Sequence, residues 1–153
     1  MIDPTVRAGT AADLDQLVEL EREARRAVVG QRGGDRWLAT HDERGARWAA
    51  AVTDGSVLVA HMDHVVVGYL VLEMGGPIAK VDEVWVTPAA RELGFGDELL
   101  AAAVAAARRS GARVLEGETL PGDRETKNLY ERAGIKARLI TVSTELQPDP
   151  PSG

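Results

Sequence analysis

The sequence predicts an α+β fold with a mixed, largely antiparallel central sheet flanked by helices. Three observations support this prediction. A short strand and two helical patterns come first, three strand-like segments follow one another in the middle, and the second half alternates helix, strand, helix and strand. Strands joined by short turns pair antiparallel, whereas a strand, a helix and a further strand form a βαβ unit. We therefore expect a βαβ unit in the second half of the chain.

The N-terminal third carries one strand signal and two helix signals. Residues 5–8 are predicted as a short strand, after which Thr10 is suited to cap a helix, with Asp13 in a variant of the capping box. Apolar residues at helical spacing then predict a helix over residues 11–28, and several glycines follow it. A second helix is expected over residues 43–52, before a turn signal that ends in glycine.

The middle of the chain is rich in β-branched and apolar residues. Residues 56–61 and 64–73 are predicted as strands of an antiparallel hairpin, because only a two-residue turn separates them. Residues 79–87 are predicted as a third strand of this set, between a glycine-proline break and a further proline. These three strands should form the centre of the sheet.

The second half contains the strongest helix signal of the sequence. Residues 96–110 have acidic side chains in the first turn, alanines in the middle, arginines in the last turn and a glycine afterwards, as the helix dipole and its caps require. A strand over residues 112–119, a helix over residues 123–133 and a final strand over residues 137–146 are expected to follow.

Length and composition limit the class of protein. At 153 residues the chain fits one domain with one core, which we place at residues 1–146. The proline-rich segment at residues 147–153 is expected to be a disordered tail. The first residues lack a basic region followed by an apolar run, so a cytoplasmic location is expected. The most apolar run, residues 99–107, is too short to span a bilayer, so no membrane partner is expected.

Charge and residue types exclude several kinds of site. The formal net charge of −6 argues against a nucleic-acid partner, because phosphates are neutralised by clustered Lys and Arg. The absence of cysteine excludes disulfides, thiolate zinc sites and a cysteine acyl-enzyme. No metal is expected either, since His61 and His64 have no further obvious ligand near them. The acidic balance would suit a cationic substrate, but many soluble proteins are acidic.

The junction between the strand at residues 79–87 and the following helix contains two glycines, Gly94 and Gly96. A helix that begins directly after such a turn presents unpaired backbone N–H groups at its positive end, where a pyrophosphate can bind. Glycine lets the backbone approach phosphates closely, but it also serves ordinary tight turns. The glycines alone leave both interpretations open.

Two motifs together resemble a known family. Arg91-x-x-Gly94-x-Gly96, preceded by Val86-x-Pro88, resembles the acyl-CoA signature of the GNAT superfamily of N-acetyltransferases. Residues 123–135 resemble the helix that ends in Tyr-Glu-Lys-x-Gly-Phe in that superfamily. The distance between the motifs leaves room for one helix and one strand, as in the superfamily. The resemblance covers about residues 65–135.

The resemblance implies an enzyme that moves an acetyl group from acetyl-CoA, its co-substrate, to an unidentified primary amine by direct transfer in a ternary complex. The acceptor would be a small-molecule or peptide amine, and the protein a monomer or homodimer. The alternative is a catalytically degenerate acyl-CoA-binding sensor or partner-binding module. Asp97 and Asp123 favour this alternative, because the family more often has a small or basic residue at the first position and Asn at the second.

Two residues are candidates for the chemistry of such a transfer. The resemblance implies that Tyr130 is the general acid near the CoA sulfur, although a tyrosine in such a helix can also simply pack in the core. Glu83 is the candidate base, since it lies on the third central strand, three residues before Val86. Strict alternation places Glu83 on the same face as Trp85 and opposite Asp82. Burial would raise its pKa, whereas at a solvated strand end it would be an ordinary acid.

The resemblance also implies the residues around the ligands. The acyl carbonyl would be held by a backbone N–H of Val86 or a neighbour, and the acceptor would meet the segment at residues 29–37. The implied cofactor-binding residues are Val84, Trp85, Val86, Arg91, Glu92, Leu93, Gly94, Phe95, Gly96, Asp97, Asp123, Lys127 and Tyr130, and the implied substrate-binding residues are Arg32, Trp37, Glu83 and Glu116. Arg32 would attract an anionic group on the acceptor, in contrast to the negative net charge, and the sequence leaves this open.

Overall fold

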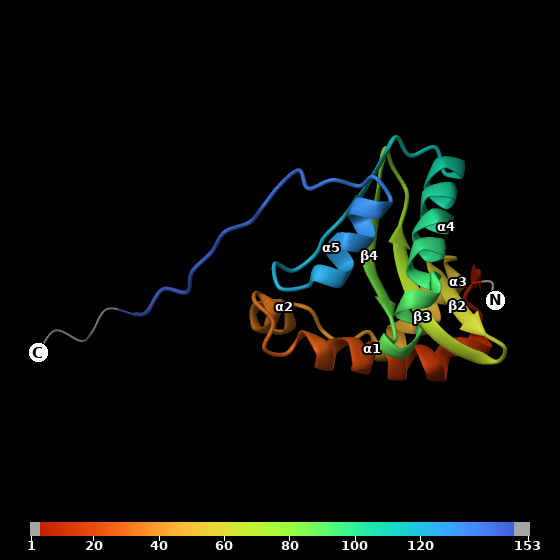
Figure 1. Ribbon diagram of the computed structural model, residues 1–153, viewed down its shortest axis with the longest axis horizontal. Helices are drawn as coiled ribbons and strands as arrows, with labels where there is room; N and C mark the ends of the chain where they lie inside the picture. Colours follow the sequence, from red (N-terminus) through yellow and green to blue (C-terminus); the bar gives the residue numbers. More distant parts are fainter. Residues whose placement is uncertain (1–3, 149–153) are drawn as a thin grey trace, which may run out of the picture.

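The computed structural model describes residues 4–148, which form one five-stranded sheet with helices on both faces (Figure 1). The strands are β1 (Thr5–Ala8), β2 (Val57–Met62), β3 (Val65–Glu73), β4 (Ile78–Val86) and β5 (Val114–Gly117), and they lie side by side in this order. Neighbours from β1 to β4 are antiparallel, whereas β4 and β5 are parallel. The predicted α+β class is therefore confirmed.

Five α-helices accompany the sheet in the described part of the chain: α1 (Leu14–Val28), α2 (Gly34–Thr40), α3 (Trp48–Thr53), α4 (Phe95–Arg109) and α5 (Arg124–Arg132). Short 3₁₀ turns cover residues 11–13, 45–47 and 88–93. The helix α4 connects β4 to β5 and completes the expected βαβ unit. None of the helices within residues 4–148 has the length and apolar composition that crossing a membrane requires.

Helix α2 was not predicted, because the glycines before it were interpreted only as breakers. Gly33 has a φ of 83°, which lets the chain turn sharply after α1. A side chain at Gly34 would collide with the carbonyl oxygen of Val28, so this glycine allows α2 to begin directly against the end of α1. The glycines thus connect two helices closely, and the segment at residues 29–37 is half helical.

The sheet separates two clusters of buried side chains. Leu70 and Leu72 of β3 face α4 and pack with its residue Leu99. Tyr69 and Val71 point to the other face, where the cluster includes residues of α1 and α3. Because both faces of β3 are covered, this strand is almost continuously apolar, in contrast to the alternating pattern of a half-exposed strand.

A β-bulge in β4 changes which side chains share a face. Val71 of β3 pairs with Glu83, but the next residue, Leu72, pairs with Val81, so Asp82 is an extra residue in β4. The prediction that Asp82 lies opposite Glu83 was therefore wrong. The bulge lets both acids reach the same arginine, Arg44.

The ladder between β4 and β5 is short. It begins at Ile78 and Val114 and ends where Val81 pairs with Gly117, whereas β4 continues to Val86. The last five residues of β4 therefore have no parallel neighbour in the described sheet. Helix α5 follows β5 in the chain, and the groove described below lies between it and the free part of β4.

The predicted strand over residues 137–146 is wrong. Residues 136–148 form no helix or strand, all are exposed, and Figure 1 shows that they extend away from the folded part. The β-type pattern alone cannot produce a strand here, because backbone N–H and C=O groups of a strand need a neighbouring strand. The segment predicted at residues 147–153 falls largely on residues 149–153, which lie outside the described residues, and the domain limits at residues 1–146 stay a prediction.

The predicted capping box of Thr10 and Asp13 is confirmed at the start of the 3₁₀ turn that leads into α1, and it carries a buried charge. Asp13 accepts hydrogen bonds from the Thr10 backbone N–H at 2.8 Å and from both terminal nitrogens of Arg7 at 2.7 and 2.9 Å. The hydrogen bonds from Arg7 lower the pKa of Asp13 from 3.8 to about 2, although burial opposes this change. The charged form of Asp13 therefore stabilises the fold.

We expect Asp13→Asn to lower the free energy of unfolding by about 2 kcal/mol at pH 7, since the folded state favours the carboxylate over its protonated form by this amount. The pKa is lower in the folded state, so the contribution is present above pH 4 and is lost as the pH falls towards 2. Urea unfolding at pH 7, 5 and 3 measures it. The exposed first-turn acid Asp15 provides the control, because Asp15→Asn should change stability little at any pH.

Candidate functional site

A groove lies between the free end of β4 and helix α5, at the point where α4 begins. It is lined by Val84, Trp85, Val86, Arg91, Gly96, Asp97, Asp123, Glu125, Thr126, Leu129 and Arg132. The first seven of these belong to the predicted cofactor-binding set. The other predicted members, Glu92, Leu93, Gly94, Phe95, Lys127 and Tyr130, do not line it, and Phe95 is fully buried in the core. The structure thus brings together the strand end, the glycine turn and the second motif.

The backbone of β4 offers a hydrogen-bond donor to this groove. The N–H of Thr87 donates to Val67 of β3 at 2.8 Å, so it points into the sheet. Backbone N–H groups alternate in direction along a strand, and the N–H of Val86 therefore points to the other side, where the ladder to β5 has ended. The carbonyl of Val86 points the same way and accepts from Arg91 Nε at 3.0 Å. No strand within residues 4–148 pairs with this side of Val86, so its N–H can donate to a ligand.

The start of α4 supplies further donors. Gly94, with a φ of 88°, precedes the helix and no side chain caps it, so the N–H groups of the first turn have no capping partner. A Cβ at Gly96 would lie 3.3 Å from Leu129 Cδ1, which shows how closely α5 approaches this turn. The positive end of α4 therefore opens into the groove, where it can bind an anionic group.

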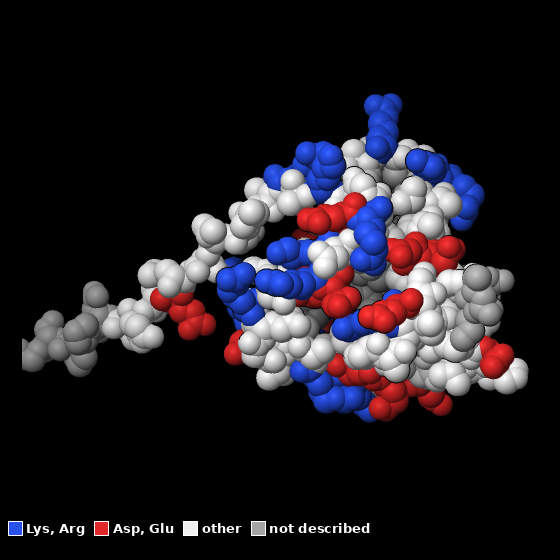
Figure 2. All heavy atoms as spheres, viewed as in Figure 1, with Lys and Arg blue, Asp and Glu red and all other residues white. Residues whose placement is uncertain are grey.

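The two acidic departures from the family motifs have structural partners. Asp97 forms an ion pair with Arg132 of α5 at 3.0 Å, and both side chains are about half exposed. Asp123 caps α5, since it accepts from the Thr126 N–H at 3.0 Å and from the Thr126 hydroxyl at 2.6 Å. Figure 2 shows acidic and basic side chains next to each other over this face. The negative charge of Asp97 is thus balanced locally.

Tyr130 is buried behind the groove. Its hydroxyl lies over Gly117 of β5, where even a methyl side chain would overlap it. Burial raises the pKa of Tyr130, and the negative charges of Asp123, Glu118 and Asp82 raise it further. The hydroxyl therefore stays protonated at neutral pH, as a proton donor must.

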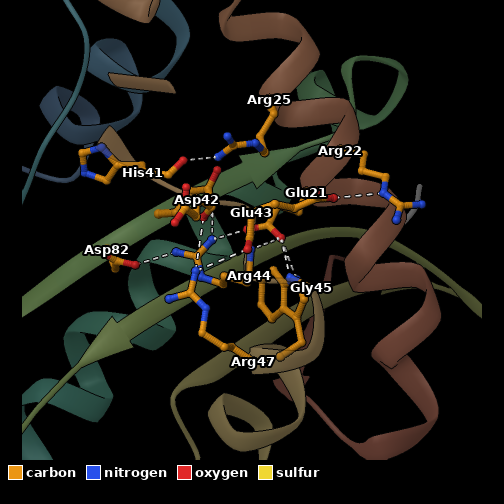
Figure 3. A network of polar contacts seen from close by, with 12 residues as sticks. Glu21, Arg22, Arg25, His41, Asp42, Glu43, Arg44, Gly45, Arg47 and Asp82 are labelled. Carbon is orange, nitrogen blue, oxygen red and sulfur yellow. Dashed lines mark hydrogen bonds and ion pairs between the residues drawn. The ribbon is translucent and has the colours of Figure 1, made fainter. Parts of the chain in front are cut away.

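Figure 3 shows a network of polar contacts around Arg44, with Glu21 and Asp82 among its members. Glu83 belongs to the same network through its ion pair with Arg44. Arg44 Nη1 donates to Glu83 at 2.5 Å and to Glu21 at 2.9 Å, while Nη2 donates to Asp82 at 2.5 Å. Glu21 is almost fully buried and also accepts from Trp48 Nε1 at 3.0 Å. Burial raises the pKa of Glu83, and the charge of Arg44 opposes but does not cancel this effect. Glu83 is thus a carboxylate with more affinity for a proton than an exposed one.

The two predicted catalytic residues lie on opposite faces of the sheet. Glu83 lies beside Tyr69, which belongs to the cluster with α1, whereas Tyr130 belongs to the cluster with α4. The structure therefore places them on either side of β4 and does not bring them into contact. Glu116, predicted to meet the substrate, lies exposed on β5.

The segment before α2 contacts the loop between β5 and α5. Arg32 Nη2 donates to the Pro121 carbonyl at 3.5 Å, and Gly33 packs on the Pro121 ring. Trp37 stacks on His41 with ring centroids 4.6 Å apart, and Arg25 lies over the Trp37 ring. Arg32 is thus close to the second motif, whereas Trp37 forms a separate cluster and does not line the groove.

Sequence reasoning missed three polar residues, Glu21, Glu23 and Arg44. Glu23 of α1 accepts from the Thr87 hydroxyl at 2.7 Å and from Trp85 Nε1 at 3.2 Å, so it fixes the end of β4. The helical spacing could have revealed Glu21, because it lies in the apolar stripe of α1. Within residues 4–148, no group of three or more His, Asp or Glu side chains is arranged to hold a metal ion.

Solved structures share this fold. A mutant of the BH1408 protein from Bacillus halodurans has a TM-score of 0.77 and 19% identity, with 94% of this chain and 99% of that chain covered. AAC(6')-Iy in complex with a CoA-containing bisubstrate analogue has a TM-score of 0.70 and 15% identity, with 95% and 100% covered. Ribosomal-protein-alanine N-acetyltransferase from Brucella melitensis biovar Abortus 2308 has a TM-score of 0.67 and 15% identity, with 94% and 100% covered. At these identities the likeness shows the fold alone.

The sequence itself identifies the family. No curated protein matches the chain significantly. The profile described as the Acetyltransferase (GNAT) family matches residues 14–135, a span that contains α1, the groove and both motifs. The chain therefore belongs to the GNAT acetyltransferase family.

Proposed function

We propose that this protein is an N-acetyltransferase that moves an acetyl group from acetyl-CoA to a primary amine by direct transfer in a ternary complex. The observation that carries the proposal is the pair of unused donor sets in one groove, the Val86 N–H on β4 and the first turn of α4. A carbonyl and a pyrophosphate are the acceptors that these donors suit. The family supports the same ligand, and the solved AAC(6')-Iy structure holds a CoA-containing analogue.

The residues of the groove fit such a ligand. The N–H groups of Gly96 and Asp97 would meet the pyrophosphate, and Arg132 adds a positive charge opposite them. The side chains of Val84 and Val86 provide an apolar wall beside the Val86 N–H. The acetyl group of acetyl-CoA is already activated as a thioester. Direct transfer therefore needs no acyl-enzyme on a cysteine, and the chain contains no cysteine.

Direct transfer forms a C–N bond, breaks a C–S bond and moves two protons. We propose that the proton of the ammonium goes to Glu83, whose pKa is raised by burial. The Tyr130 hydroxyl would give a proton to the leaving thiolate and be restored by the second proton that the nitrogen loses as the amide forms, and the Val86 N–H would stabilise the oxyanion. The acceptor would be a small-molecule or peptide amine that approaches past Arg32, and the reaction would take place in the cytoplasm.

We expect acetyl-CoA to raise the melting temperature. A ligand at a hundred times its Kd adds about 2.7 kcal/mol, which for a domain of this size is a shift of roughly 5–10 °C. Differential scanning fluorimetry with and without millimolar acetyl-CoA measures this shift.

Asp97→Asn should strengthen the binding of acetyl-CoA by up to about fivefold, because it removes a half-exposed negative charge beside the pyrophosphate and frees Arg132. If acetyl-CoA changes the melting temperature of neither the unmodified protein nor Asp97→Asn, the turn at Gly94 and Gly96 does not bind this ligand.

We expect Glu83→Gln to remove the acidic limb of the pH–rate profile. A base must be deprotonated, so kcat/KM of the unmodified enzyme should fall as the pH drops through the raised pKa of Glu83. Glutamine keeps the side-chain shape and can still accept from Arg44, but it cannot titrate. Glu19→Gln is the control, since this exposed acid of α1 forms an ion pair with Arg22 and has no part in the proposed chemistry. The same acidic limb in Glu83→Gln would assign the base to another group.

A further inference from the structure

Helix α1 holds the end of β4 on both sides of Val86. One carboxylate oxygen of Glu23 accepts from the Thr87 hydroxyl at 2.7 Å, and the other accepts from Trp85 Nε1 at 3.2 Å. Side chains two residues apart on an extended chain point to the same face, so a single acid on α1 can reach both. Glu23 thus connects the two neighbours of Val86, the residue whose N–H is the proposed oxyanion donor.

This end of β4 has a paired neighbour on one side only in the described sheet. The parallel ladder with β5 ends where Val81 pairs with Gly117, whereas β4 continues to Val86. Backbone groups on the open side of a strand are not held by a ladder of hydrogen bonds. The direction of the Val86 N–H therefore depends on the contacts that hold the residues around it.

The other groups around this N–H are fixed by close contacts. The Trp85 carbonyl lies so near Gly68 of β3 that a Cβ there would be 2.7 Å from its oxygen. The Val86 carbonyl accepts from Arg91 Nε at 3.0 Å, and the Arg91 guanidinium carbon lies 4.6 Å from the centre of the Trp85 ring. The Trp85 carbonyl and the Val86 N–H belong to one planar trans peptide and point in opposite directions. A rotation of this peptide would therefore misdirect the donor.

We propose that Glu23 is a positioning residue for the acetyl transfer. Its two hydrogen bonds keep the peptide between Trp85 and Val86 in one orientation, so that the Val86 N–H points at the thioester carbonyl. The inference rests on the proposed function and adds a residue of α1 to it. A donor stabilises an oxyanion best when it is already aimed at the position where the charge develops. The negative charge of Glu23 would itself disfavour a nearby oxyanion, so its contribution comes from its hydrogen bonds.

The carbonyl stretch of bound acetyl-CoA reports how well the donor is aimed, and it requires no acceptor amine. Infrared difference spectra of acetyl-CoA with and without a ¹³C label at the acetyl carbonyl isolate this band. A hydrogen-bond donor polarises the carbonyl and lowers the wavenumber of the band. With the unmodified protein we expect the band of bound acetyl-CoA to lie below that of free acetyl-CoA. Glu23→Ala should lose about half of this lowering or more.

Glu23→Gln separates hydrogen bonding from charge. Glutamine can accept from Trp85 Nε1 and donate to the Thr87 hydroxyl oxygen, so both contacts can persist and the band should stay at its lowered position. Glu19→Ala is the matched control, because this exposed acid of the same helix forms an ion pair with Arg22. Its band should match that of the unmodified protein. Circular dichroism checks that each variant is folded.

Kinetics provide a second readout with any amine that the unmodified enzyme acetylates. Because loss of a whole oxyanion donor lowers kcat by about a hundredfold to a thousandfold, a misdirected donor in Glu23→Ala should lower kcat about tenfold. The KM for acetyl-CoA should stay within about twofold, since the aim of this donor matters mainly in the transition state. Thr87→Val removes only the hydroxyl and should give a smaller loss. Added to Glu23→Ala it should cause little further loss, because both changes break the same contact.

The outcomes separate this inference from the proposed function. If acetyl-CoA does not bind the unmodified protein, the proposed function is wrong and the role of Glu23 falls with it. If acetyl-CoA binds but its carbonyl band is the same in Glu23→Ala as in the unmodified protein, only the role of Glu23 is wrong. Equal effects of Glu23→Gln and Glu23→Ala would assign the effect to the charge and would also overturn the proposal. If Glu23→Ala does not fold, Thr87→Val decides in its place, and an unchanged band in that variant contradicts the proposal.

Discussion

Tyr130→Phe is expected to lower kcat about a hundredfold while the affinity for acetyl-CoA stays within a factor of two. The size follows from the usual contribution of a general acid to a proton transfer. The affinity for acetyl-CoA should stay unchanged because phenylalanine keeps the ring contacts and the hydroxyl acts only on the thiolate that forms as the C–S bond breaks. The hydroxyl carries its proton at neutral pH, as any tyrosine does, and burial with three neighbouring carboxylates raises its pKa further, so it is a weaker acid than an exposed tyrosine and needs a basic acceptor such as the thiolate. Steady-state kinetics together with the thermal shift by acetyl-CoA measure both quantities.

The dependence on the leaving group separates this role from simple packing. If Tyr130 protonates the thiolate, an acetyl thioester of a more acidic thiol depends less on a proton donor. The loss of kcat caused by Tyr130→Phe should then be smaller with that thioester than with acetyl-CoA. A hydroxyl that only packs over Gly117 would give the same relative rate for both thioesters. Phenylalanine retains the ring and its contacts, so the fold should persist. Unchanged turnover would remove Tyr130 from the mechanism.

The sequence predicted those parts of the fold that depend on local signals. The hairpin of β2 and β3 follows from a two-residue turn between apolar runs, and α4 from its charged ends and following glycine. Asp13 and Thr10 were sufficient to locate the start of α1, because their hydrogen bonds are local. The groove could be predicted in outline, since both motifs that line it are continuous in sequence.

Features that depend on contacts between distant segments could not be predicted. The bulge at Asp82 results from pairing with β3, and no pattern within β4 indicates it. Arg44 lies 39 positions from Glu83 and in a segment with no strong periodicity, so the sequence could not indicate that the two side chains form an ion pair. The strand expected at residues 137–146 has the right pattern, but a strand needs an edge to pair with, and the edge in its own chain is not used.

Arg44→Met is expected to lower the free energy of unfolding by about 3–5 kcal/mol at pH 7.5, the usual cost of breaking a buried ion pair from one side. This corresponds to a fall in melting temperature of roughly 10 °C. The side chain is mostly buried and holds Glu21, Glu83 and Asp82, so its loss leaves their carboxylates close together without a cation. Arg47→Met is the matched control, because that arginine is exposed and donates only to backbone carbonyls at 3.3 Å.

The pH dependence of Arg44→Met tests the electrostatic cause. Without the arginine, burial and mutual repulsion raise the pKa of Glu83 further above its unfolded value. A raised pKa in the folded state means that the protonated form is favoured there, so relative stability is retained at low pH and lost as the pH rises. The deficit of Arg44→Met should therefore be smaller at pH 5 than at pH 8, and the acidic limb of any remaining activity should move to higher pH. An equal deficit at both pH values would show that Arg44 acts through packing over Trp48, whose ring lies 5.1 Å from its guanidinium carbon, and not through its charge.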